Sequence, residues 1–407
     1  MRWLFLGLYT LSSLYSLFLL FLNRRQRRLK LPENIQDVYD LHEYQRWQAY
    51  EDETDRFSMI YQTIEFLFIS FMILSPYYQW ISALFPKNIL MNSLLMMFIT
   101  SIIEMLIQIP FQYYQIFVIE EKYHMNTTKL QLFIIDLLKE NIMNMGLLTI
   151  LFVFVHFFSL WFGYGGFVIL FIMMIILVGF IQRYPLMIMK IFNTFTPLEE
   201  GNLKDDLTKL VEKYGFELKG IYVTDASKRT KRANAFCCGA GKKKEICLDD
   251  NMLMHYQKDE ILAVFAHEFG HAIYRHTEKL RWLNYIQMIA MFGIFLFVMM
   301  NQWLYADFGI GQMNYFMVLV IVSWIISLMT DCFTIVTSYY SRLCEYEADA
   351  FAVKEGYGEL LIHLLKKLSR NGLSNIYPHP LVVKLSYSHP PLAQRIDAME
   401  RLIKKNG

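Results

Sequence analysis

Long apolar runs constrain the fold of this chain more than any other feature of its sequence. A helix needs about 20 consecutive apolar residues to cross the hydrocarbon core of a bilayer. Hydrophobic residues make up 55% of the chain, and they are concentrated in about seven runs of suitable length. These runs lie at 3–22, 58–78, 89–119, 142–162, 167–182, 283–304 and 315–336. The sequence therefore predicts a mainly α-helical membrane protein with several spans.

The distribution of basic residues predicts how these spans are oriented. If the N-terminus lies outside, almost every Lys and Arg falls in the cytosolic segments 23–57, 120–141, 183–282 and 340–407. The loops on the opposite side, near 79–88, 163–166 and 305–314, contain only Lys87. Cytosolic loops of membrane proteins are enriched in Lys and Arg. We therefore expect the large polar segments to lie in the cytosol.

A basic cluster directly follows the first apolar run. Its members are Arg24, Arg25, Arg27, Arg28 and Lys30. A secretory signal peptide carries its positive charge before the apolar stretch and ends in a small-residue cleavage site. Here the basic cluster follows the apolar run instead of preceding it, and no small-residue cleavage site is present. We interpret the run as a retained span whose basic end lies in the cytosol.

The polar segments divide the chain into four predicted regions. They are an N-terminal membrane region with five spans (1–196), a cytosolic α+β insert (197–282), two further spans (283–338) and a cytosolic C-terminal region (339–407). Within the insert, apolar periodicity and turn residues predict local elements. These elements are a helix at 203–214, a strand at 220–224 and a hairpin with strands at 233–238 and 245–248 around a Gly-Ala-Gly turn.

The run His-Glu-Phe-Gly-His at 267–271 lies on a helix predicted to begin near Gln257. On a helix, His267 and His271 are four residues apart and project from one face. Two neutral imidazoles suit Zn²⁺, whose catalytic sites use three protein ligands. Glu268 is placed to take a proton from a water molecule held there. The alternative is a surface helix with two solvated histidines.

The best local candidate for a third ligand lies near residue 345. Glu345 and Asp349 are four residues apart on a second predicted helix. This spacing suits one carboxylate on the metal and one behind it that orients a histidine. Glu347 is expected to point away from that face. A solvated acidic helix is the alternative, but these acids follow directly on a span and lie close to Phe351 and Ala352.

Five motifs extend the argument to nearly the whole chain. They are FVIEEK at 117–122 with Asn126, NAF at 234–236 with Gly239 and Lys242, HEFGH at 267–271, EYEAD at 345–349, and SHPP at 388–391 with Arg395. In this order, they resemble the motifs of the Ste24-type CaaX prenyl proteases, zinc metalloproteases of the endoplasmic reticulum membrane. Two departures are Met125, where the family usually has Phe, and Cys237-Cys238, where aromatic or aliphatic residues are common.

The resemblance implies a role for each matching residue of the metal site. Glu345 becomes the third ligand of one zinc ion, beside His267 and His271. Glu268 becomes the general base, and Asp349 supports the site from behind.

Further roles and the fold also follow from the resemblance. His389 is implied to face the zinc and stabilise the oxyanion, and Arg395 to hold that region in place. Asn234 lies on the presumed edge strand, where an extended substrate can pair through its main chain. The implied fold is a ring of seven helices around a water-filled chamber. A small gluzincin-like α+β insert and C-terminal helices lie at its cytosolic end.

The implied activity is removal of the C-terminal tripeptide from prenylated CaaX proteins. The expected location is the endoplasmic reticulum membrane and, beyond it, the nuclear envelope. The expected partners are the prenylated substrate and the lipid bilayer, with no nucleic acid. Two alternatives remain. A quality-control protease of the HtpX type shares the zinc chemistry but has about four spans and lacks the element at 117–122. A catalytically silent membrane scaffold predicts decay of the metal site, whose residues are all present.

Overall fold

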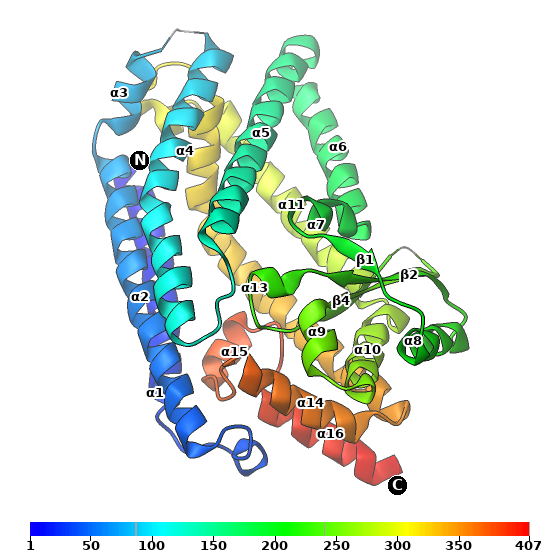
Figure 1. Ribbon diagram of the computed structural model, residues 1–407. Coiled ribbons are helices and arrows are strands. Elements are labelled where there is room, and N and C mark those ends of the chain that lie inside the picture. The colour runs from blue at the N-terminus through cyan, green and yellow to red at the C-terminus, as the bar shows by residue number, and fades with distance from the viewer. Residues whose placement is uncertain (86–87, 240, 407) are drawn as a thin grey trace.

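The structure is a computed structural model that describes residues 1–85, 88–239 and 241–406. Lys87 and the central Ala240 of the predicted hairpin turn lie outside the described residues. Long helices extend towards the top of Figure 1, and a small sheet and shorter helices gather at its lower end.

Seven helices of the described chain are long and apolar enough to cross a membrane. They are α1 (Arg2–Gln26), α2 (Leu41–Leu74), α4 continued by the π-helix η2 (Ile89–Glu120), α5 (Leu130–Phe162), α6 (Tyr164–Arg183), α11 (His276–Met300) and α13 (Tyr315–Lys354). The predicted mainly α fold with about seven spans is confirmed.

Several of these helices extend well beyond the apolar runs that predicted them. α2 begins at Leu41, where the Asp40 side chain accepts a hydrogen bond from the Glu43 N–H at 2.7 Å. It ends at Leu74, so the prediction that this span reaches residue 78 is wrong. Pro76 lacks an N–H and restricts the residue before it, which ends the helix there. Hydropathy identifies the apolar part of a helix that can cross a bilayer, but it does not detect the polar turns that extend the helix beyond it.

Two other boundaries also differ from the expected ones. The turn expected over 163–166 is reduced to Gly163, which has a φ of +55°, and α6 begins at the next residue. α13 continues through position 338 to Lys354, so the last span and the acidic segment near Glu345 form one helix. The remaining short helices are η1 (Glu33–Ile35), α3 (Tyr77–Ala83), α7 (Leu186–Phe192), η3 (Ala226–Lys228), α9 (Asp250–His255), α12 (Trp303–Ala306) and α15 (Pro380–Ser386).

A four-stranded sheet forms the centre of the insert. Its order is β1 (Phe195–Pro197), β2 (Glu217–Thr224), β4 (Lys243–Asp249) and β3 (Ala235–Cys238). β3 and β4 pair antiparallel, as the predicted hairpin requires, whereas β2 and β4 pair parallel. β1 was not predicted, since its three residues are too few for an alternating pattern. Within the described residues β3 lies at one edge of the sheet.

One hydrophobic core joins the insert to the C-terminal region. It contains Phe265 and Phe269 from α10 (Lys258–Ile273), Ile246 from β4, and Phe351 from α13. α8 (Asn202–Lys213), α14 (Gly358–Asn371) and α16 (Leu392–Asn406) complete it. Burial of each large apolar side chain contributes about 1.5–3 kcal/mol. This shared core fixes α10 against α13, and the candidate site lies between these two helices.

Candidate metal centre

α10 begins where the sequence predicted and packs unusually close to α13. Gln257 caps it, and the backbone N–H of Gln257 donates to the Glu260 carboxylate at 2.8 Å. Further along α10, a Cβ on Gly270 would lie 3.0 Å from the Cα of Ala348 and 3.2 Å from the Cβ of Phe351. Only glycine, which has no Cβ, allows two backbones to approach this closely.

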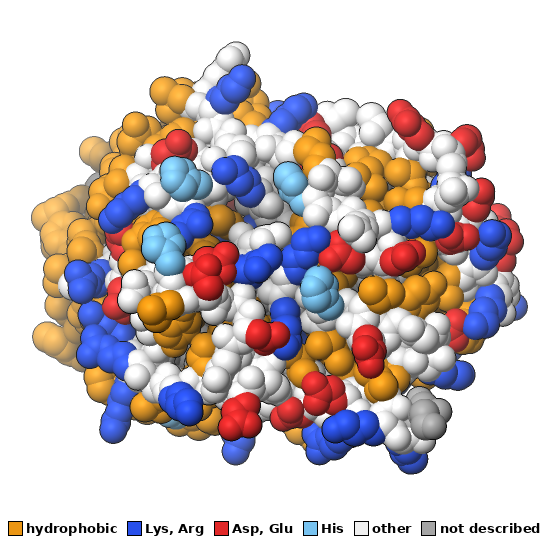
Figure 2. All heavy atoms as spheres, turned by 60° about the horizontal axis from the view of Figure 1, so that its bottom comes forward, with side chains coloured by type: hydrophobic (Ala, Val, Ile, Leu, Met, Phe, Trp, Pro, Cys, Tyr) orange, Lys and Arg blue, Asp and Glu red, His pale blue; other side chains and the backbone are white. Residues whose placement is uncertain are grey.

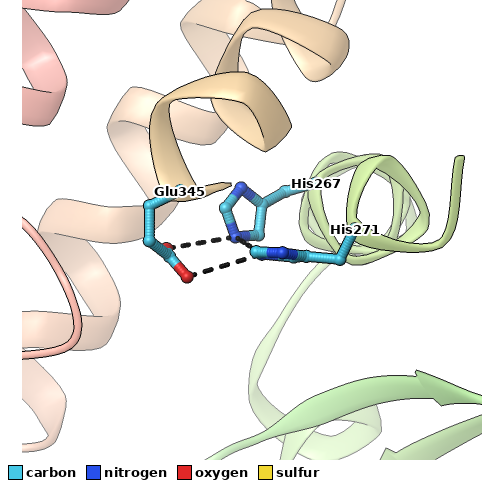
Figure 3. Close-up of side chains that lie close together, drawn as sticks. All are labelled: His267, His271 and Glu345. Atoms are coloured by element: carbon cyan, nitrogen blue, oxygen red, sulfur yellow. Dashed lines mark hydrogen bonds and ion pairs between the residues drawn. The ribbon is translucent and has the colours of Figure 1, made fainter. Parts of the chain in front are cut away.

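Figure 3 shows His267 and His271 of α10 facing Glu345 of α13. The Nε2 atoms of the two histidines are 3.3 Å apart. Glu345 Oε2 lies 3.5 Å from Nε2 of His267, and its Oε1 lies 3.4 Å from Nε2 of His271. One potential ligand atom from each residue falls within 4.8 Å of the others.

The Glu345 carboxylate provides a test of whether this group fits a metal. Its Oε2 is buried and accepts no well-formed hydrogen bond among the described residues; its nearest cationic neighbours are Nη1 of Arg395 at 3.4 Å and Nε2 of His267 at 3.5 Å. Leaving such an oxygen unsatisfied costs about 1–3 kcal/mol, and more for a charged group. A cation at the point where the three side chains converge would satisfy it. Two imidazole nitrogens and one carboxylate oxygen also form a donor set of catalytic metal sites.

His267 is held from behind by a buried ion pair. Its Nδ1 lies 2.9 Å from Oδ1 of Asp349, which is 1% exposed. Arg395 donates to both Asp349 oxygens, from Nε at 2.9 Å and from Nη2 at 2.7 Å. Burial opposes protonation of His267, but the neighbouring carboxylates of Asp349 and Glu345 raise its pKa to about 9. Ligation of a metal through Nε2 would require His267 in its neutral form.

His271 is supported by two residues that the sequence did not identify as part of the site. Its Nδ1 lies 2.9 Å from Nδ1 of His276, and Nε2 of His276 lies 2.8 Å from the Glu347 carboxylate. Arg275, with a φ of +58°, makes the sharp turn that places His276 under the end of α10. Glu347 is not among the three converging residues, as predicted, yet it reaches the site through His276.

Glu268 lies next to the ligands on α10. Burial raises the pKa of its carboxyl group, and the two neighbouring histidines partly offset that effect. A carboxylate with a raised pKa accepts a proton more effectively near neutral pH. The position and the pKa shift of Glu268 therefore both suit a general base.

His389 approaches the site from the loop before α16. Its Nε2 lies 3.4 Å from Oε1 of Glu345, and its Nδ1 lies 2.9 Å from the Ser388 hydroxyl. The side chain is 66% exposed and borders a cavity of about 460 Å³ that Tyr387 and Arg395 also line. His389 can therefore present a donor to a molecule that approaches from the open side.

Asn234 stands just before β3, and its carbonyl accepts a hydrogen bond from the Asp249 N–H at 3.0 Å. β3 contacts α10 and is the edge strand of the sheet. Burial raises the pKa of the Cys237 thiol on this strand to about 12, which keeps it protonated and unreactive near neutral pH. The structure thus places an edge strand beside the helix that carries both histidines.

The FVIEEK segment at 117–122 and Asn126 contact the residues that precede β3. Glu120 accepts a hydrogen bond from the Tyr50 hydroxyl at 2.8 Å and lies 3.5 Å from Nη2 of Arg232. Asn126 forms a β-bridge with Thr230. These contacts connect α2 and η2 of the membrane region with the residues that lead into β3.

Seven apolar helices and a buried histidine–histidine–glutamate centre define a membrane metallopeptidase. Residues 197–403 match the model of peptidase family M48. Residues 21–194 match a model described as CAAX prenyl protease N-terminal, five membrane helices. The chain belongs to peptidase family M48, and its resemblance to the Ste24-type proteases is confirmed.

Individual relatives match over most of their length. The chain is 32% identical to CAAX prenyl protease 1 of Saccharomyces cerevisiae, over 77% of this chain and 73% of that protein. It is 31% identical to CAAX prenyl protease 1 homolog of Arabidopsis thaliana, over 79% and 76% respectively. The crystal structure of S. mikatae Ste24p matches with a TM-score of 0.88 and 25% identity, covering 98% of this chain and 99% of that chain.

Proposed function

We propose that this metallopeptidase uses zinc to remove the C-terminal tripeptide from prenylated CaaX proteins. The observation that carries the proposal is the convergence of His267, His271 and Glu345 beside an edge strand, within a seven-helix membrane protein. Relatives that match this chain over about three quarters of their own length carry the names CAAX prenyl protease 1 and CAAX prenyl protease 1 homolog.

Each residue around the centre has a separate role in the proposed reaction. When bound, zinc polarises the scissile carbonyl and makes water more acidic. Glu268 takes the proton of the attacking water and passes it to the leaving amine. His389 donates from Nε2 to the oxygen that becomes negatively charged. Asp349 and Arg395 keep His267 in the orientation that ligation requires.

The substrate is positioned by its backbone and by its lipid. An extended CaaX tail pairs through its main chain with β3 near Asn234, since an edge strand offers unpaired N–H and C=O groups. The prenyl chain lies in a water-filled chamber among the seven helices. The basic segments favour an active site that faces the cytosol. The proposed location, which follows from the family resemblance, is the endoplasmic reticulum membrane and the nuclear envelope.

The direct test uses matched CaaX peptides with and without a farnesyl group, together with zinc stoichiometry. We expect about one zinc per chain, release of the last three residues, and a kcat/KM at least about tenfold higher for the farnesylated peptide. Burial of only two methylene-sized groups gives about that factor. Equal rates would favour a general quality-control protease, and zinc far below one per chain would favour a silent scaffold.

A further inference from the structure

One face of α1 is apolar along the membrane and basic at its end. Its exposed apolar side chains recur every three or four residues, at Leu11 (56%), Leu14 (58%), Phe18 (47%) and Phe21 (61%). Residues with this spacing share one face of a helix. The next two positions at this spacing are Arg25, in the last turn of α1, and Arg28, two residues past its end, and both are exposed. The exposed apolar stripe therefore leads directly to two guanidinium groups.

The basic cluster at the end of α1 contains side chains that point into the protein and side chains that are exposed. Arg27 is 2% exposed and forms ion pairs with Asp52, at 3.2 Å, and with Asp55. Arg25 and Arg28 form no ion pair within the described part of the chain, so their charges are available to a ligand. The ion pairs of Arg27 hold α1 against α2. Arg25 and Arg28, by contrast, have no such role in packing within the protein.

Arg24 adds a second indication of a ligand. Its Nε is buried and has no hydrogen-bond partner among the described residues, and it lies 3.7 Å from Asp52. Together with Phe21, Arg25 and Arg28, it lines a cavity of about 270 Å³. Three guanidinium groups thus surround one hollow beside an aromatic ring.

The chemistry of this hollow fits a phosphate attached to a lipid. Guanidinium groups bind phosphate oxygens in pairs of parallel hydrogen bonds. Viewed from this end of the molecule, Lys and Arg side chains border a broad hydrophobic surface (Figure 2). A free phosphate would use only the arginines, whereas a phospholipid also uses the apolar stripe. Basic clusters next to a membrane helix attract anionic lipids in the same way.

We propose that Phe21, Arg24, Arg25 and Arg28 bind the headgroup of an anionic phospholipid whose acyl chain lies along the apolar face of α1. This site is separate from the metal centre and does not depend on the proposed function. Asn23, on the same turn, accepts a hydrogen bond from the backbone N–H of His379 at 3.0 Å. The proposed lipid site therefore lies at the end of α1 that contacts the C-terminal region of the chain.

The test is native mass spectrometry of the full-length, zinc-loaded protein titrated with phosphatidylserine or phosphatidylcholine of identical acyl chains. We expect at least one phosphatidylserine to bind several-fold more tightly than phosphatidylcholine. Arg25→Gln/Arg28→Gln should weaken phosphatidylserine binding about thirtyfold, or about fivefold for each basic side chain. The matched control is Lys404→Gln/Lys405→Gln, which removes two exposed charges from the end of α16 and should leave binding unchanged.

Three results would overturn the proposal. They are equal binding of the two lipids, an equal loss in the control variant, and full displacement of phosphatidylserine by inorganic phosphate at a similar concentration. The last result would indicate a site for free phosphate. Unchanged zinc content and unfolding temperature show that the double variant is folded. If it fails that check, Arg28→Gln alone should still lose about fivefold in affinity, and an unchanged affinity would reject the site.

Discussion

The two histidines of the centre lie one helical turn apart and yet are held in different ways. The side chain of His267 is 7% exposed and contacts a carboxylate directly, that of Asp349, which is 1% exposed. The side chain of His271 is 22% exposed and reaches its carboxylate through His276, and the Glu347 side chain is 52% exposed. Both arrangements give Nδ1 an acceptor, so that Nε2 is left for the metal.

The residues that support the two histidines should therefore contribute unequally to the free energy of unfolding. The inner support is a desolvated Asp–Arg pair inside the shared core, and breaking such a pair leaves a buried charge. The outer support ends in a half-exposed carboxylate that water can replace at little cost. Substitutions on the inner side should therefore affect folding and metal binding together, whereas those on the outer side should affect mainly metal binding.

The largest effect is expected for Asp349→Asn. It leaves Arg395 buried with its main partner gone, which should lower the free energy of unfolding by about 3–5 kcal/mol. Zinc affinity should fall by about 10–100-fold, as for other outer partners of a ligand histidine. Thermal unfolding and competition with a chelator measure the two quantities. The double variant Asp349→Asn/Arg395→Met should recover part of the lost stability. If Asp349→Asn alone were as stable as the original chain, the buried Asp349–Arg395 pair would not stabilise the fold.

A smaller effect is expected for His276→Ala. This change removes the acceptor for Nδ1 of His271, so zinc affinity should fall by about tenfold. His276→Asn can still offer an acceptor oxygen and should retain most of the affinity. Chelator competition distinguishes the two variants, and the free energy of unfolding should change less than in Asp349→Asn. Equal zinc affinities for the Ala and Asn variants would show that the hydrogen bond has no role.

The smallest effect is expected for Glu347→Gln. Its side chain is 52% exposed, and the neutral amide keeps an acceptor for His276. Removing the charge of a half-exposed carboxylate costs about 0.2–1 kcal/mol, so zinc affinity should fall by no more than about fivefold. A loss as large as that of Asp349→Asn, measured by the same competition, would remove the distinction between the two sides.

Much of this centre could be predicted from residue spacing. The i, i+4 pairs 267/271 and 345/349 place side chains on one face of each helix, and the structure brings the two faces together. His276 could not be found in this way because it lies beyond the end of α10, after a left-handed turn at Arg275. A third histidine just after a metal-binding helix is the one signal that could have identified it.

The fold was predictable to a similar extent. Apolar run length predicted the number of spans, since the bilayer sets that length. It could not predict where helices end in water, so the polar start of α2 at Leu41 and the extension of α13 to Lys354 were missed. The parallel pairing of β2 with β4 depends on tertiary packing, which local patterns do not specify.

The most direct test of the central claim is the activity of zinc-loaded Glu268→Gln on a farnesylated CaaX peptide. The change removes the proposed base and leaves His267, His271 and Glu345 in place. We expect about one zinc per chain, with kcat reduced by about 10²–10⁴-fold. Cleavage near the original rate, or cleavage that continues after a chelator has removed the metal, would contradict the claim.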